Sequence, residues 1–125
     1  MTGYIVDLEK KTLSNENFRE VLYTAKNSQL VVMTIQPGED IGVETHEGHD
    51  QFIRVEAGTA KALLSGEEHE LTDGFAVVIP AGTEHNIINT GTDKLKLYTL
   101  YTPPEHPDGT IHATKSDALN ASLEH

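Results

Sequence analysis

Turn-forming residues recur along this chain at intervals that leave room for strands but not for helices of ordinary length. The intervening runs are apolar or alternate apolar with polar residues, as in Leu30–Ile35, Phe75–Ile79 and Leu95–Tyr101. The turn signals are Lys26-Asn27-Ser28, Gln36-Pro37-Gly38, Glu47-Gly48, Ala57-Gly58, Ser65-Gly66, Thr72-Asp73-Gly74, Pro80-Ala81-Gly82 and Thr90-Gly91-Thr92. Many short strands joined by tight turns are typical of a β-sandwich or a β-barrel.

Helical signals are confined to two short stretches near the ends of the chain. Ser14 is suited to cap one turn over residues 15–18, and the stretch from Lys115 to Leu119 favours a second turn. Neither stretch is long enough to organise a core. We therefore predict an all-β fold with at most short helical turns near the termini.

The segment that follows the last long strand is rich in proline. Its prolines prevent regular structure, so residues 102–109 are expected to form a stiff loop. We expect this loop to pack on the outside of the fold or against a partner subunit. The alternative is that it covers one mouth of a barrel, where Glu105, His106 or Asp108 would supply a group for proton transfer.

The chain has 125 residues and no cysteine. Its length suits one domain, which we place at residues 1–122, and Leu123-Glu124-His125 resembles the start of an expression tag. Without cysteine there is no disulfide, no thiol nucleophile and no thiolate metal ligand. Any metal ion must therefore be held by nitrogen and oxygen ligands.

Charge and hydropathy argue against two further classes of protein. The formal net charge is -11 at pH 7, which opposes a sequence-independent grip on nucleic acid because such a grip needs clustered Lys and Arg. No stretch approaches the roughly 20 apolar residues of a membrane span, and the N-terminus lacks the apolar core of a signal peptide. We therefore expect a cytoplasmic protein that binds neither nucleic acid nor membrane.

Two spaced patterns cover residues 38–89. The first is Gly38, five residues, Glu44, one residue, His46, four residues, Gln51, six residues and Gly58. The second is Gly74, five residues, Pro80, one residue, Gly82, two residues, His85, three residues and Asn89. In these patterns the chain resembles the cupin superfamily, because they are similar to the two signature motifs of that family. The second pattern fits at every specified position, whereas in the first Glu44 stands for the family's first His and Gln51 for its Glu.

The resemblance implies a double-stranded β-helix, or jelly-roll barrel, of the small single-domain microbial kind. It also implies one divalent metal ion at the matched positions, which here are Glu44, His46, Gln51 and His85. Residues two apart on a strand point the same way, so Glu44 and His46 can share the barrel interior. Two imidazoles, one carboxylate and one amide oxygen suit Mn, Fe, Ni or Zn. Four ligands would leave positions open for water or a substrate.

The resemblance does not fix a reaction. The family includes isomerases, epimerases, dioxygenases, decarboxylases, lyases and binding proteins without chemistry. We expect a metal-dependent enzyme of the isomerase, lyase or dioxygenase type acting on a small oxygen-bearing metabolite, with Glu44 as the candidate catalytic base. The alternatives are a non-catalytic small-molecule-binding or sensing barrel, and a scaffold subunit without metal. No Arg and Lys cluster suited to a phosphate is visible in the sequence.

Several other residues have assigned positions in this scheme. His49 is the alternative to Gln51 as a ligand, but its loop would have to fold inward. Arg54 is out of register with Gln51 and should face away from the metal, and only one of Tyr98 and Tyr101 can line the cavity. Asn89 is expected to satisfy backbone groups near a turn. The histidines expected at the surface are His69 and His112.

The edges of an open jelly roll need covering. The apolar segments Tyr4-Ile5-Val6 and Val21-Leu22-Tyr23 are suited to pair across a two-fold axis. We therefore expect a homodimer with a small-molecule ligand in each barrel.

Overall fold

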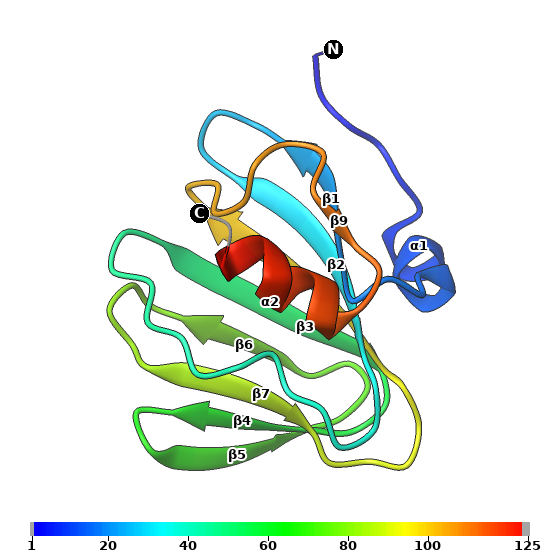
Figure 1. Ribbon diagram of the computed structural model, residues 1–125, viewed down its shortest axis with the longest axis vertical. Helices are drawn as coiled ribbons and strands as arrows, with labels where there is room; N and C mark the ends of the chain where they lie inside the picture. Colours follow the sequence, from blue (N-terminus) through cyan, green and yellow to red (C-terminus); the bar gives the residue numbers. More distant parts are fainter. Residues whose placement is uncertain (1, 124–125) are drawn as a thin grey trace.

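The computed structural model of the chain describes residues 2–123 and consists mainly of strands, with two short helices near its ends (Figure 1). In chain order the elements are α1 (Leu8–Ser14), β1 (Arg19–Thr24), β2 (Gln29–Ile35), β3 (Asp50–Ala57), β4 (Ala60–Leu64), β5 (Glu67–Leu71), β6 (Ala76–Ile79), β7 (His85–Asn89), β8 (Leu95–Thr102), β9 (Ile111–His112) and α2 (Lys115–Leu123). Over residues 2–123, no helix is long and apolar enough to cross a membrane. The predicted all-β fold class is confirmed.

The strands form two antiparallel sheets that enclose one core (Figure 1). The larger sheet has the order β6-β3-β8-β2-β1-β9, and the smaller sheet has the order β5-β4-β7. Residues 40–44 add to the smaller sheet, because Asp40 bridges Ile88 and Glu44 bridges His85. From β3 onward the chain passes repeatedly between the two sheets. This crossing is the arrangement of the predicted jelly-roll barrel.

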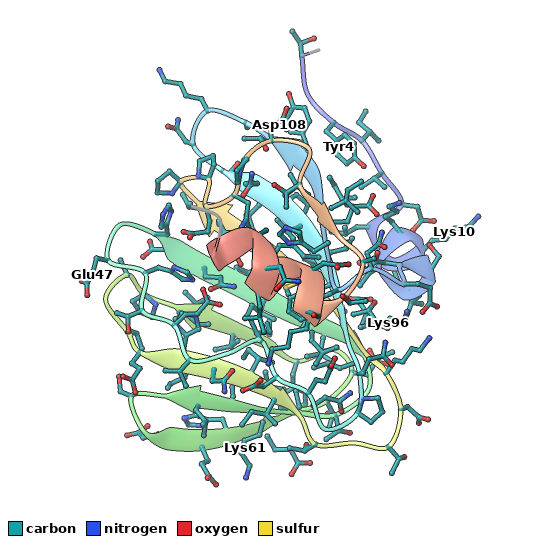
Figure 2. The ribbon with its side chains drawn as sticks, viewed as in Figure 1. Tyr4, Lys10, Glu47, Lys61, Lys96 and Asp108 are labelled. Carbon is teal, nitrogen blue, oxygen red and sulfur yellow. The ribbon has the colours of Figure 1, made fainter. Side chains whose placement is uncertain are left out.

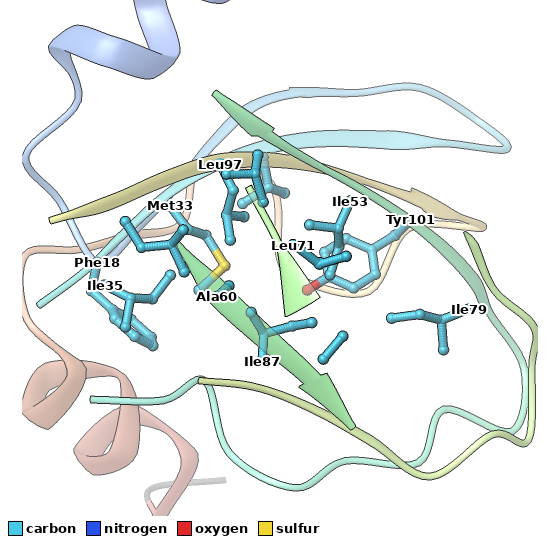
Figure 3. Close-up of a cluster of buried hydrophobic side chains, with 14 of the residues drawn as sticks. Phe18, Met33, Ile35, Ile53, Ala60, Leu71, Ile79, Ile87, Leu97 and Tyr101 are labelled. Carbon is cyan, nitrogen blue, oxygen red and sulfur yellow. The ribbon is translucent and has the colours of Figure 1, made fainter. Parts of the chain in front are cut away.

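An apolar core fills the space between the sheets (Figure 3). Val31, Met33 and Ile35 of β2 alternate into this core and belong to one cluster with Ile87 of β7. Fully burying an aliphatic side chain of this size stabilises the fold by roughly 1.5–3 kcal/mol. Tyr101 of β8 is also part of the cluster and is 2% exposed. The core therefore spans both sheets and ends, at Tyr101, next to a group of polar residues.

Gly58 shows why the first pattern ends in glycine. Its φ is +95°, a conformation that residues with a Cβ atom rarely adopt. A Cβ atom here would also lie 3.0 Å from the carbonyl oxygen of Lys94 and 3.1 Å from Cα of Leu95. The turn after β3 passes so close to the start of β8 that only glycine fits at this position.

The N-terminal helix lies earlier than the sequence indicated. Asp7 caps α1 with its side chain, and Asn15 ends it. The Asn15 side chain donates a hydrogen bond to Thr34 Oγ1 at 3.1 Å, which ties the end of the helix to β2. The predicted turn over residues 15–18 capped by Ser14 was therefore wrong, because Asp7 and Asn15 place a complete helix before that stretch.

The C-terminal helix α2 is present and extends beyond the single turn predicted at Lys115 to Leu119. Ala118 of α2 is buried in the core cluster, and the helix lies beside Phe18 at one end of the barrel (Figure 3). Leu123 is the last residue of α2. The other two residues of the predicted tag, Glu124 and His125, lie outside the described residues, and the domain boundary stays a prediction.

The proline-rich loop folds over the barrel mouth. Gln29, which is 0% exposed, accepts hydrogen bonds from the backbone N–H groups of Glu105 (3.2 Å) and His106 (3.0 Å). It also donates to the carbonyl oxygen of His106 at 2.8 Å. The His106 ring then lies 5.2 Å from the Tyr101 ring, edge to face. The expectation that this loop packs outside the barrel was wrong, because the buried Gln29 amide draws its backbone inward.

Candidate functional site

Glu44 and His85 are held opposite each other by their backbones. The N–H of each residue donates a hydrogen bond to the carbonyl oxygen of the other, both at 2.9 Å. Directly opposed residues of an antiparallel pair project from the same face. This bridge therefore sets a carboxylate beside an imidazole from a different hairpin.

His46 joins these two residues. Its ring centroid lies 5.3 Å from that of His85, and its Nε2 lies 3.2 Å from Glu44 Oε2. On the other side of the ring, Nδ1 lies 3.5 Å from Oε2 of Glu105 in the proline-rich loop. The imidazole of His46 is therefore placed between two carboxylates.

Gln51 approaches from the larger sheet. It is 4% exposed and pairs across β3 and β8 with Tyr101, whose ring lies 6.0 Å from the His46 ring. Its Nε2 donates a hydrogen bond to Thr99 Oγ1 at 3.0 Å. Its Oε1 is buried and has no hydrogen-bond partner in the described part of the chain. The amide oxygen thus remains available for a ligand.

The donor atoms of this cluster fit a divalent metal ion in their chemistry. Among residues 2–123, His46 Nε2 and Gln51 Oε1 are buried without a hydrogen-bond partner, which is unfavourable unless a ligand binds them. In His85, Nδ1 lies 2.9 Å from the carbonyl oxygen of Thr83, a contact in which Nδ1 donates and which leaves Nε2 as the atom that would bind a metal ion. With the Glu44 carboxylate, the set is two imidazole nitrogens and two oxygens, which suits Mn, Fe, Ni or Zn.

The cluster is not a preformed metal cage. Over residues 2–123, no group of three or more His, Asp or Glu side chains is arranged to hold a metal ion. Glu44 and His46 instead make a close ionic contact that is not an aligned hydrogen bond. A metal ion bound by these residues would replace this contact, since donor atoms bound side by side at about 2.1 Å from one ion lie about 3 Å apart.

The electrostatics of the cluster favour an ionised Glu44. Burial raises the pKa of Glu44, but the contact with His46 and the charges of His46, Arg19 and His85 outweigh burial and hold that pKa below its ordinary value. The same contact raises the pKa of His46 above its ordinary value, although burial opposes the rise. Glu44 is thus in the state that binds a cation or accepts a proton.

The side-chain alternation predicted for the larger sheet is correct. Tyr101 points inward, whereas Tyr98 contacts Phe52 at a ring distance of 6.2 Å and is only partly buried. Arg54 is exposed and pairs with Glu56 at 2.7 Å, away from the cluster. The face of the sheet that bears Gln51 and Tyr101 therefore lines the site, as the parity of the strand predicted.

His49 contacts the proline-rich loop, and its ring lies 5.9 Å from that of His46, edge to face. Its Nδ1 lies 2.7 Å from the carbonyl oxygen of Pro103, and its Nε2 lies 2.8 Å from Glu105 Oε2. His69 is exposed on β5, as expected. Asn89 also has its expected role, since its side chain donates to the carbonyl oxygens of Ile35 and Asp93, both at 2.9 Å.

A cavity of about 440 Å³ opens beside the cluster. Its walls come from residues 41–44, the proline-rich loop, β9 and α2, and it includes Glu44 and Glu105. His112, expected in a surface tail, lines this cavity from β9, so that expectation was wrong. The volume lies in the range of small-molecule sites, about 300–1,000 Å³.

Sequence reasoning missed two residues that shape the site. Arg19 is 8% exposed and lines the cavity, and Gln29 anchors the proline-rich loop. Gln29 carries a usable signal, because it is a lone amide at the start of the apolar run Leu30–Ile35. Arg19 lies outside both spaced patterns, and nothing in its neighbourhood marks it.

The fold and the site define a class: a small antiparallel jelly roll with histidine, glutamate and glutamine side chains gathered at one mouth, beside a cavity. Residues 31–101 match the family described as "Cupin domain". The chain belongs to this cupin family, which confirms the resemblance seen in the two spaced patterns.

Individual relatives extend this similarity over most of the chain. The chain is 44% identical to "Uncharacterized protein YrkC" of Bacillus subtilis (strain 168) over 124 residues, which cover 94% of this chain and 67% of YrkC. It is 49% identical to "Uncharacterized protein L612" of Acanthamoeba polyphaga mimivirus over 112 residues, which cover 86% of this chain and 70% of L612. The crystal structure of BH2720 from Bacillus halodurans matches with a TM-score of 0.92 at 44% identity, covering 94% of this chain and 93% of that one.

Proposed function

We propose that this cupin binds one divalent metal ion (Mn, Fe, Ni or Zn) and acts with it on a small oxygen-bearing metabolite. The residues that would hold the ion are Glu44, His46, Gln51 and His85. The observation that carries the proposal is the pair of buried donor atoms, His46 Nε2 and Gln51 Oε1, that have no hydrogen-bond partner among residues 2–123. When bound, the metal would supply Lewis-acid activation of a carbonyl or hydroxyl oxygen, in chemistry of the isomerase, lyase or dioxygenase type.

Glu44 has the position required of a general base. It belongs both to the cluster and to the cavity wall, so a molecule in the cavity lies against its carboxylate. Its lowered pKa keeps it ionised at neutral pH. A base must reach the proton that it removes, and Glu44 is the carboxylate of the cluster that opens directly on the cavity.

Two residues of the proline-rich loop support this chemistry. The Glu105 carboxylate near Nδ1 of His46 favours a proton there and leaves Nε2 for a ligand. Burial and the charge of Arg19 lower the pKa of His106 to about 3. The His106 ring is therefore neutral at the cavity wall, and its buried Nε2 has no partner among the described residues. It can accept a hydrogen bond from a substrate hydroxyl group.

Elemental analysis tests the metal proposal. Protein freed of any C-terminal histidine tag is compared with the His46→Ala, His85→Ala double variant and with His69→Ala, which removes an exposed imidazole. We expect about one equivalent of metal in the parent and in His69→Ala, and none in the double variant. No metal in the parent, even after reconstitution with each of the four ions, would refute the proposal. A bound Fe would direct substrate screening to oxygen chemistry, and Zn or Mn to isomerase or lyase chemistry.

A non-catalytic binding or sensing barrel is the second candidate. The observation that favours it is that residues 2–123 contain no preformed group of three ligands, although a cavity of about 440 Å³ is present. In that case the metal-loaded parent, the metal-free parent and the double variant would all bind the same small molecule with equal affinity. Tighter binding by the metal-loaded parent than by the two metal-free proteins would favour the metal-dependent function.

We also propose that the chain forms a homodimer in the cytoplasm. The two predicted contact segments lie side by side, since the rings of Tyr4 and Tyr23 stack at 5.4 Å. Ile5 is 100% exposed next to them. A second copy of the chain would cover this apolar surface.

A further inference from the structure

The cavity beside the cluster contains a buried positive charge. Arg19 lies at the start of β1, lines the cavity and is 8% exposed. Its guanidinium lies 5.2 Å from the Phe18 ring centroid, and Nη1 lies 3.4 Å from His112 Nδ1. Its Nε atom is buried and has no hydrogen-bond partner in residues 2–123.

The other charged groups of the cavity form no direct ion pair with Arg19, although its charge acts on Glu44 from a distance. Glu44 contacts His46, and Glu105 contacts His46 and His49, whereas neither carboxylate forms an ion pair with Arg19. The other cation of the wall, Lys115, is already paired with Asp40. A buried charge without a partner is strongly unfavourable. Among residues 2–123, no carboxylate contacts Arg19 directly, so its guanidinium is open to an anion in the cavity.

The surroundings of Arg19 add no further charge. Burial and the charge of Arg19 lower the pKa of His112, and the same two causes lower the pKa of His106 to about 3. Both imidazoles are therefore neutral at neutral pH. A ligand that balances this end of the cavity carries about one negative charge, which fits a carboxylate better than a phosphate monoester with a charge of about -1.5 to -2.

We propose that this cavity binds the carboxylate of a small organic acid, with the guanidinium of Arg19 as its counter-ion. The planar fork of arginine matches the two oxygens of a carboxylate. The inference rests on the proposed function for the part of the ligand that faces Glu44 and the metal. It names the class of substrate: a small acid whose carboxylate lies at Arg19 and whose carbonyl or hydroxyl oxygen lies towards the cluster.

Titration of metal-free protein with matched probes tests the inference. Pyruvate carries the carboxylate, methyl pyruvate lacks its charge, and inorganic phosphate offers a more highly charged anion. Each is titrated by NMR into the parent, Arg19→Gln and Arg19→Lys. Lys61→Gln is the control, because Lys61 lies outside the cavity on β4 (Figure 2). Thermal unfolding of each variant establishes that it folds.

We expect the parent to bind pyruvate at least roughly ten-fold more tightly than methyl pyruvate or phosphate, and Arg19→Gln to lose at least roughly ten-fold in pyruvate affinity. Arg19→Lys should retain an intermediate affinity, and Lys61→Gln the full affinity. Equal binding of pyruvate and methyl pyruvate, tighter binding of phosphate, or unchanged affinity in Arg19→Gln would overturn the inference. Elemental analysis of each protein as purified, before its metal is removed for the titration, separates the two proposals. A parent that holds metal but does not bind pyruvate refutes only the carboxylate site, and the reverse result refutes only the metal.

Discussion

Replacing Gln29 with leucine should release the proline-rich loop from the barrel mouth. The Gln29 side chain is fully buried and makes four hydrogen bonds. One joins Thr24 Oγ1 at 2.9 Å, and the others join the backbone of Glu105 and His106 at 2.8–3.2 Å. Leucine has a similar volume, so the change removes the hydrogen bonds and leaves little cavity.

The size of the effect follows from these contacts. A hydrogen bond contributes about 0.5–1.5 kcal/mol net, and a buried group left without its partner costs about 1–3 kcal/mol. The loop is partly exposed, so water can replace some of the lost partners of Glu105 and His106. We therefore expect Gln29→Leu to lower the free energy of unfolding by about 2–4 kcal/mol and Tm by about 10 °C.

Urea unfolding measures the stability, and hydrogen exchange measures the loop. The control is Gln36→Leu, which changes an exposed glutamine in the turn after β2. The amides of Glu105 and His106 should exchange faster in Gln29→Leu and at the parental rate in the control. If Gln29→Leu lowers the free energy of unfolding by less than about 1 kcal/mol, or leaves hydrogen exchange at these amides unchanged, other contacts hold the loop.

Three further predictions follow from particular residues. Gly58→Ala should lower the free energy of unfolding, measured with urea, by about 2–4 kcal/mol, because strain at positive φ is added to a 3.0 Å approach to a carbonyl oxygen. The control Gly66→Ala should lower it by less, because a Cβ atom at Gly66 meets nothing within 4 Å. Because the pKa of His106 is lowered to about 3, only the unfolded chain binds this proton between pH 6.5 and pH 3, so stability falls on acidification. Between pH 6.5 and pH 4, the free energy of unfolding should therefore fall by about 2 kcal/mol less in His106→Gln than in the parent. Identical profiles of unfolding free energy against pH would contradict this. If the chain forms a homodimer, sedimentation at micromolar concentration should give the mass of two chains. A mass of one chain would count against the homodimer.

The sequence predicted the fold because its signals are local. Turn residues and alternating apolar runs mark each strand, and the positive φ of Gly58 explains why one spaced position is glycine. The alternation along β3 and β8 also placed Gln51 and Tyr101 on the inner face correctly. Strand parity is a property of the backbone, so it can be derived without knowing the neighbours.

The errors concern contacts between segments that are distant in the sequence. Prolines indicate a stiff loop, but its direction depends on Gln29, which lies 77 positions from His106. His112 was assigned to the surface because two-residue β9 has too little pattern to be recognised. Arg19 escaped notice because a single arginine becomes informative only once it is known that its Nε is buried without a hydrogen-bond partner in the described part of the chain. Side-chain pairing of this kind is not encoded in local spacing.

The barrel mouth is one connected structure. Gln29 holds the backbone of Glu105, and the Glu105 carboxylate contacts His46 and His49. His46 in turn contacts Glu44, which also forms part of the cavity wall. A ligand that needs Nε2 of His46 therefore gains affinity when the loop keeps Glu105 at Nδ1. By linkage, binding of that ligand must stabilise the loop by the same free energy. The anchor at Gln29 is thus a determinant of the site, although its side chain reaches neither the cluster nor the cavity.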